Sequence, residues 1–119
     1  MGNPGIIAFK PAGAYDSAFS ICMPIFLTAG LVGTVVPIPN LIGNAGIWTV
    51  ANLDTAFSGG WEISMHSGNT FVGESEVDVR ATMVSHLADM ATAGYVPKGI
   101  SPSGGAYDEA TYTIMKDYL

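Results

Sequence analysis

Residues 59–81 read GGWEISMHSGNTFVGESEVDVRA, and the spacing of apolar side chains in this stretch predicts the fold class. Trp61, Ile63 and Met65 are each separated by one polar residue. A period of two is typical of a β-strand with one buried face. Residues 75–81 alternate again, with Val77, Val79 and Ala81 expected on the inner face. The two segments, joined by a turn at 67–69, predict a β-meander with one solvated face.

The sequence after this stretch changes its periodicity. Apolar residues recur at Val84, Leu87, Ala88 and Ala91, a spacing that predicts a helix near residues 82–93. A glycine and then a proline follow, and such residues commonly end helices. Residues 99–119 begin with a flexible GISPSGG segment and are expected to form a linker and a docking arm, with a short helix possible over 109–119.

The sequence before this stretch has no charged residue between Asp16 and Asp54. Residues 17–38 are long enough to cross a bilayer, which makes a membrane helix one alternative. Pro24 inside the segment, frequent β-branched residues and turn signals about every ten residues favour short strands instead, over 17–27 and 31–38. Residues 47–51 are a further β-prone run. The expected fold is therefore mainly β, an antiparallel sandwich or barrel-like meander, with one helix and extended terminal arms. Its parts are an arm (1–16), a β-rich domain (17–98) and a second arm (99–119).

Composition limits the classes of partner. The chain has 119 residues, enough for one core, and its charged fraction is 12%, against roughly 25% in ordinary soluble domains. Four basic residues and a net charge of −6 argue against nucleic acid. Few charges and many small residues indicate that much of the surface is buried, either against neighbouring chains or in a membrane. The prolines and turn residues in and after residues 17–38 make the membrane the less favoured of the two. The N-terminal residues do not have the pattern of a signal peptide.

Each candidate site residue has a simpler structural interpretation. Cys22 lies in an apolar run and is expected to be a buried thiol. His66 is expected on the outer face of a strand. His86 lies three residues before Asp89, a spacing that can orient an imidazole but more often forms a surface contact.

The acidic and aromatic candidates also have simpler structural interpretations. Glu74, Glu76 and Asp78 could bind calcium, but Arg80 partly neutralises them and solvated carboxylates are the commoner outcome. Trp48 and Trp61 could stack on a sugar, but their places in predicted strands favour core positions. The glycines match no phosphate-binding loop. No catalytic, cofactor-binding or metal residue is predicted.

The loop and strand at residues 59–65 and the strand ESEVDVRA at 74–81 resemble small β-sandwich proteins of tailed-phage virions, over residues 47–81. The resemblance implies a non-enzymatic virion structural protein that assembles symmetrically, as a capsid decoration (cement) protein or a tail or baseplate adaptor. Its partners would be copies of itself and other virion proteins, and its location would be the virion, assembled in the host cytoplasm. The alternatives are a membrane protein that uses residues 17–38 and a carbohydrate-binding module that uses Trp48 or Trp61.

Overall fold

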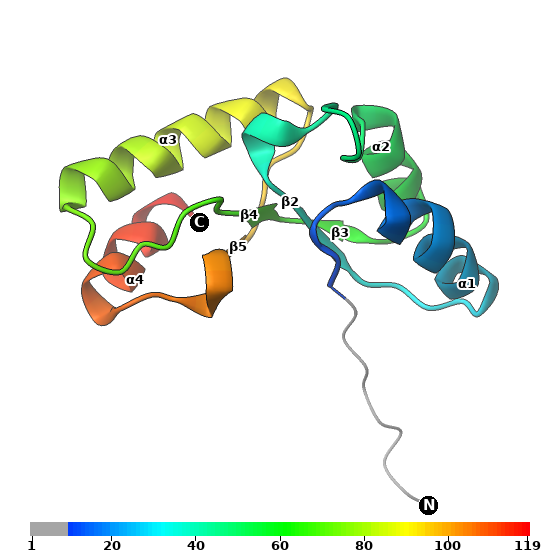
Figure 1. The fold of residues 1–119 in the computed structure, drawn as a ribbon, viewed down its shortest axis with the longest axis horizontal. Coiled ribbons are helices and arrows are strands. Elements are labelled where there is room, and N and C mark those ends of the chain that lie inside the picture. The colour runs from blue at the N-terminus through cyan, green and yellow to red at the C-terminus, as the bar shows by residue number, and fades with distance from the viewer. Residues whose placement is uncertain (1–9) are drawn as a thin grey trace, which may run out of the picture.

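A parallel β-sheet with helices between its strands forms the centre of the molecule (Figure 1). The computed structural model describes residues 10–119. The strands are β1 (Ala12–Gly13), β2 (Thr34–Pro37), β3 (Glu62–Ile63), β4 (Met65–His66) and β5 (Ile100–Ser101). All three strand pairings, β1 with β2, β2 with β3, and β4 with β5, are parallel. They form a three-stranded sheet in the order β1-β2-β3 and a two-stranded sheet in the order β4-β5. Only Ser64 separates β3 from β4, and its amide donates to the Val35 carbonyl oxygen of β2, so the two sheets continue one into the other.

Four α-helices follow the strands in turn. They are α1 (Met23–Thr28), α2 (Val50–Ser58), α3 (Glu76–Thr92) and α4 (Glu109–Met115). A π-helical turn, Ala18–Cys22, leads into α1, and single 3-10 turns lie at Pro39–Leu41, Ser103–Gly105 and Lys116–Tyr118. In Figure 1, α1 and α2 lie on one side of the strands and α3 and α4 on the other. Parallel strands require such crossover connections, so this is an α/β fold.

The core lies between the sheet and the helices. Val35, Trp48, Met65, Phe71 and Met83 are among its fully buried side chains. The indole Nε1 of Trp48 donates a hydrogen bond to the Tyr15 carbonyl oxygen at 2.8 Å, and its ring packs edge-on against Phe19. Trp48 and Trp61 are both buried, as the sequence predicts.

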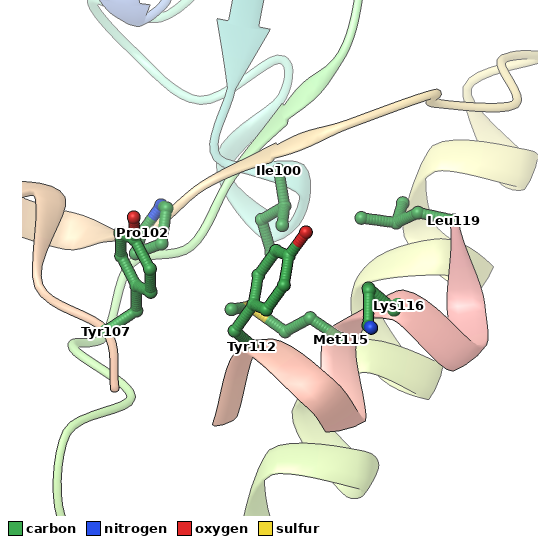
Figure 2. Close-up of a pocket in the computed structure, with 7 residues that line it drawn as sticks. All are labelled: Ile100, Pro102, Tyr107, Tyr112, Met115, Lys116 and Leu119. Atoms are coloured by element: carbon green, nitrogen blue, oxygen red, sulfur yellow. The ribbon is translucent and has the colours of Figure 1, made fainter. Parts of the chain in front are cut away.

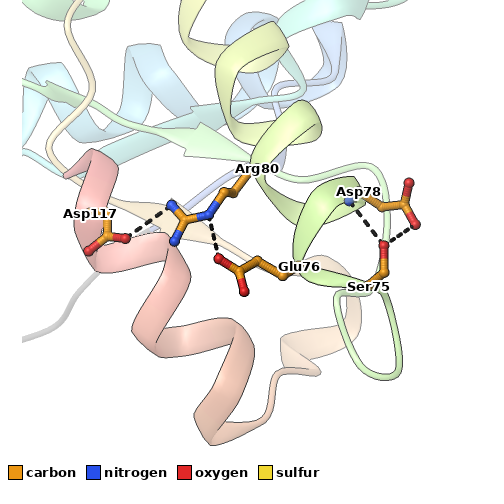
Figure 3. Close-up of polar contacts among 5 residues, drawn as sticks. All are labelled: Ser75, Glu76, Asp78, Arg80 and Asp117. Atoms are coloured by element: carbon orange, nitrogen blue, oxygen red, sulfur yellow. Dashed lines mark hydrogen bonds and ion pairs between the residues drawn. The ribbon is translucent and has the colours of Figure 1, made fainter.

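The prediction of a mainly β sandwich is wrong, and the segment 75–81 shows why. It forms the first turns of α3, because Ser75 caps the helix: its Oγ accepts from the Asp78 amide at 3.3 Å and donates to Asp78 Oδ2 at 2.6 Å (Figure 3). Acidic residues in this first turn favour the helix further. The helix predicted at 82–93 exists, but it begins at Glu76. The alternation over 61–66 is confirmed as strand, with Trp61, Ile63 and Met65 buried.

The predicted strand over 17–27 is also wrong. This segment is helical, and Pro24 lies in the first turn of α1, where a missing N–H costs little. The strand expected at 31–38 is confirmed over Thr34–Pro37. Within residues 10–119, no helix is long and apolar enough to cross a membrane, and residues 17–38 are divided between a helix and a strand.

The extended C-terminal arm of the predicted fold is wrong as well. Residues 100–101 form β5, and α4 packs against α3 with Thr111 and Met115 buried. Asp108 caps α4, accepting from the Thr111 amide at 2.8 Å. The N-terminal arm falls mainly on residues 1–9, which lie outside the described part of the chain. The division into three parts at residues 16 and 98 stays a prediction.

Candidate functional site

The two faces of the sheet differ in chemistry. Residues paired in neighbouring parallel strands point to the same face. Val35 pairs with Ile63, and both are buried against the helices. Thr34 pairs with Glu62 on the other face, where Glu62 is exposed. Because parallel sheets are normally covered on both sides, a polar, open face is a candidate binding surface.

A pocket of about 200 Å³ lies on this polar face. The residues that line it come from the segment before β1, from β2, from the junction of β3 and β4, and from β5 with the residue before it. They are Lys10, Thr34, Val36, Ser64, Gly99, Ile100 and Ser101. Ser64 Oγ donates a hydrogen bond to the Gly99 carbonyl oxygen, which ties the β3–β4 junction to the start of β5. The pocket is therefore built by the sheet itself.

Lys10 spans the polar face. It precedes β1, at one edge of the sheet, yet its Nζ donates to Ser101 Oγ at the end of β5, the opposite edge, at 2.9 Å. This hydrogen bond places the Lys10 ammonium group beside the last residue of β5, in a pocket that also contains Thr34, the first residue of β2.

His66 lies at the same end. It is the last residue of β4 and pairs with Ser101 of β5, so alternation places both on one face. Its ring is half-buried, and its Nδ1 has no hydrogen-bond partner within residues 10–119. The next residue, Ser67, makes a tight turn, donating to the Asn69 carbonyl oxygen at 2.6 Å and accepting from the Asn69 amide at 3.1 Å. Lys10, His66 and Ser101 are hereafter called the strand-end cluster.

His86 of α3 lies close enough to His66 to be influenced by its charge. Burial lowers the pKa of His86 below its usual value; Asp89 opposes this effect, and His66 adds to it. Both ring nitrogens of His86 are buried without a partner in the described residues. The fold thus brings His66 and His86 near each other, although they lie on different elements. Burial favours the neutral form of His86.

The acidic candidates do not form a calcium-binding strand. Glu76 and Asp78 lie in the first turn of α3, where Glu76 pairs with Arg80 at 2.8 Å (Figure 3). Arg80 also pairs with Asp117 at 3.1 Å. The Tyr118 hydroxyl and the carboxylates of Glu76 and Asp117 raise the pKa of Arg80. Across residues 10–119, no three His, Cys, Asp or Glu side chains are grouped so that they could hold a metal ion. We therefore derive no metal-dependent step.

The remaining candidates lie outside the strand-end cluster. Trp48 and Trp61 are in the core and cannot stack on a sugar as placed. Cys22 is a half-buried free thiol in the turn before α1. Sequence reasoning singled out His66 but missed Lys10 and Ser101. Ser101 fell in an expected linker, and only a parallel arrangement of strands places it beside His66.

Comparison with solved structures shows the same fold in carbohydrate esterases. A deacetylase from Streptococcus pyogenes, PplD, solved with acetate, matches 93% of this chain with a TM-score of 0.84 and 15% identity. A family 4 carbohydrate esterase from Streptomyces lividans, also solved with acetate, matches 93% at 0.70 and 15% identity. A CE4 family pseudoenzyme from Bacillus anthracis matches 93% at 0.72 and 10% identity. No protein-family model and no curated protein matches the sequence.

This chain corresponds to only part of each neighbour. It covers 51% of the S. pyogenes deacetylase, 56% of the S. lividans esterase and 39% of the B. anthracis pseudoenzyme. The strands and helices described above therefore span about half of the larger fold or less.

These neighbours overturn the predicted identity. The resemblance of residues 47–81 to β-sandwich virion proteins is wrong, because those residues belong to an α/β fold shared with carbohydrate esterases and deacetylases. The predictions of a non-enzymatic virion structural protein and of a virion location rested on that resemblance and are corrected with it. The expected partners, including copies of the chain itself, are not tested by this finding.

Proposed function

We propose that this chain is a carbohydrate-binding domain of the carbohydrate-esterase fold, and that it receives an acetylated saccharide at the strand-end cluster. The observation that carries the proposal is the hydrogen bond from Lys10 Nζ to Ser101 Oγ, at the last residue of β5, which pairs in register with His66 of β4. Two of the neighbours that share the fold were solved with acetate, which shows that members of this fold accept an acetyl-sized group.

The chemistry of the cluster suits such a ligand. The Lys10 ammonium can donate to a carbonyl or carboxylate oxygen, and the Ser101 hydroxyl can donate or accept. The methyl of an acetyl group could lie against Val36 and Ile100, the apolar part of the pocket lining. The cluster thus combines polar groups for an acetyl oxygen with a small apolar surface.

The test is calorimetric titration with three oligosaccharides: chitooligosaccharides, their deacetylated forms, and O-acetylated xylooligosaccharides. Binding of either acetylated ligand and not of the deacetylated one is expected, and the two acetylated ligands distinguish amide from ester. Lys10→Met should weaken binding by about tenfold or more, since a hydrogen bond to a charged group contributes about 1.5–3 kcal/mol. Lys116→Met, which replaces an exposed lysine after α4 and outside this pocket, is the matched control. Equal binding by all three ligands, or equal losses in both variants, contradicts the proposal.

The pairing of His66 with Ser101 supports a second candidate function, hydrolysis of the acetyl group. Adjacent serine and histidine side chains are a common nucleophile and base. Ser101 Oγ would attack the carbonyl carbon while His66 takes its proton and passes it to the departing alcohol or amine. Water would then release acetate and regenerate Ser101. Acetate release that Ser101→Ala abolishes, with labelling of Ser101 by a fluorophosphonate probe, is the expected result. Binding without acetate release would leave the first function standing and reject this one.

A further inference from the structure

Lys98 differs from the other basic side chains, which all have a partner in the described part of the chain. Lys10 donates to a serine hydroxyl, and Arg80 pairs with two carboxylates. Lys116 Nζ lies 5.2 Å from the centroid of the Tyr112 ring, and both side chains line the groove shown in Figure 2. Within residues 10–119, the exposed side chain of Lys98 has no hydrogen bond, ion pair or ring contact. Its ammonium group is therefore available to an external anion.

A pocket of about 400 Å³ contains Lys98. Its lining comes from the end of α2, the start of β3 and the segment between α3 and β5. The lining residues are Phe57, Glu62, Ile63, Gly94, Tyr95, Val96 and Lys98. This α2–β3 pocket shares no lining residue with the pocket of the strand-end cluster, so it is a separate candidate site. Its volume is within the range of small-molecule sites, about 300–1,000 Å³.

Two aromatic rings form the apolar wall of this pocket. The Phe57 ring is 61% exposed and packs edge-on against the Tyr95 ring, with the centroids 5.8 Å apart. The Tyr95 hydroxyl donates to Asp54 Oδ1 of α2 at 2.5 Å, and the Tyr95 amide donates to the Met90 carbonyl oxygen at 2.9 Å. Burial and the contact with Asp54 raise the pKa of Tyr95 to about 12, so its hydroxyl keeps its proton. The wall is therefore held in place from both α2 and α3.

Glu62 and Lys98 place one charge of each sign in the same pocket. Both side chains are exposed, and they form no ion pair with each other or with another residue of 10–119. A ligand with only a negative charge would be attracted by Lys98 and repelled by Glu62, and a ligand with only a positive charge would meet the reverse. A ligand that carries both charges matches both side chains.

We propose that the α2–β3 pocket binds a free α-amino acid with an apolar side chain. The ammonium group of the ligand lies against Glu62, its carboxylate against Lys98, and its side chain against the rings of Phe57 and Tyr95. The two charge-assisted hydrogen bonds orient the ligand, and the ring wall selects an apolar side chain. This site does not depend on the proposed saccharide site, because the two pockets have no residue in common.

NMR titration of the isotopically labelled chain at neutral pH tests the proposal with three probes that share a phenyl ring. L-phenylalanine carries both charges, phenethylamine lacks the carboxylate, and hydrocinnamate lacks the ammonium group. L-phenylalanine should shift the signals of Phe57, Gly94 and Tyr95. Each of the other two probes should bind about tenfold more weakly or less, because each loses one charge-assisted contact and meets one charge of its own sign.

Two substitutions separate the roles of the charges. Lys98→Met should weaken the binding of L-phenylalanine about tenfold or more and strengthen that of phenethylamine. Glu62→Gln should also weaken the binding of L-phenylalanine, but it should strengthen that of hydrocinnamate instead. Lys116→Met and Glu109→Gln are the matched controls, since both replace exposed charged residues outside this pocket. Circular dichroism checks that each variant is folded.

Three results would overturn the proposal. Equal binding of the three probes would mean that the pocket recognises only the phenyl ring. Absence of binding, or equal losses in the variants and their controls, would mean that Glu62 and Lys98 hold no ligand of this kind. Shifts at Phe57 and Tyr95 with a chitooligosaccharide and not with L-phenylalanine would assign the pocket to a saccharide. The Lys10→Met chain should bind L-phenylalanine normally, so failure of the saccharide site leaves this test unaffected.

Discussion

At the scale of single residues, the strand-end cluster depends on contacts between positions far apart in the chain. Lys10 and Ser101 are separated by almost the whole described sequence, yet their side chains form a hydrogen bond. Ser101 and His66 are neighbours only because β4 and β5 pair in parallel. His86, on α3, lies close enough to His66 for their charges to interact. Each of these side chains acquires its chemical role from the fold rather than from a local motif.

His86 should make the stability of the protein depend on pH. Burial lowers its pKa in the folded state, so below the ordinary value near 6.5 the unfolded chain binds a proton that the folded chain resists. The free energy of unfolding should therefore fall as the pH drops from 7.5 to 5.5. In the His86→Gln variant, the free energy of unfolding should fall less over this pH range, because the part of the decline that His86 causes is absent. Urea denaturation at both pH values measures it, and an equal decline in the variant would show that other groups are responsible.

At the scale of elements, the helix caps decide what hydrophobic spacing alone leaves ambiguous. Residues 75–81 alternate as a strand would, but Ser75 and Asp78 have the spacing of a helix cap and form one. Thr49 and Asn52 form a reciprocal capping box at the start of α2, in a stretch whose residues favour a strand. Asp108 and Thr111 do the same for α4. These capping residues are visible in the sequence. They indicate that helices begin near residues 50, 76 and 109, where the apolar spacing alone predicted strands or an arm.

Removing the cap of α3 should destabilise the protein measurably. Ser75→Ala leaves the Asp78 amide without its acceptor and should lower the free energy of unfolding by about 1 kcal/mol. Ser85→Ala removes an exposed serine from the middle of the same helix and should change stability little, or raise it slightly. Chemical denaturation of both variants gives the comparison. Equal effects would mean that the Ser75 cap contributes nothing.

Capping also makes α4 sensitive to acid. Hydrogen bonds from the Thr111 amide and hydroxyl lower the pKa of Asp108. The stabilisation it provides is therefore present above the ordinary aspartate pKa and is lost as the pH falls through the lowered value. Asp108→Ala should remove that dependence and weaken the docking of α4 on α3. Amide hydrogen exchange of α4 at neutral pH, compared with α2, measures the loss. Unchanged protection of α4 would contradict this role for the cap.

At the scale of the whole molecule, the sequence predicts the core better than the topology. The burial of Trp48, Trp61, Ile63 and Met65, the strand over 61–66 and the later part of α3 follow from the spacing of apolar residues. The parallel pairing does not follow from this spacing, because it depends on crossover connections between distant segments. Residues 17–27 and 75–81, which belong to two of these connections, have the residue pattern of strands although they form helices. The contact with other chains that the low charge content predicts stays a prediction.

NMR can locate the saccharide on the protein, and this measurement tests most directly whether the strand-end cluster binds it. Amide and side-chain shifts are followed while an acetylated chitooligosaccharide is added to isotopically labelled chain, with the deacetylated oligosaccharide as control. The account predicts that the largest shifts fall on His66, Ser67, Gly99 and Ser101, and that Lys10→Met removes them. Shifts centred instead on the exposed rings of Tyr107 and Tyr112, or the absence of shifts with both ligands, would contradict it.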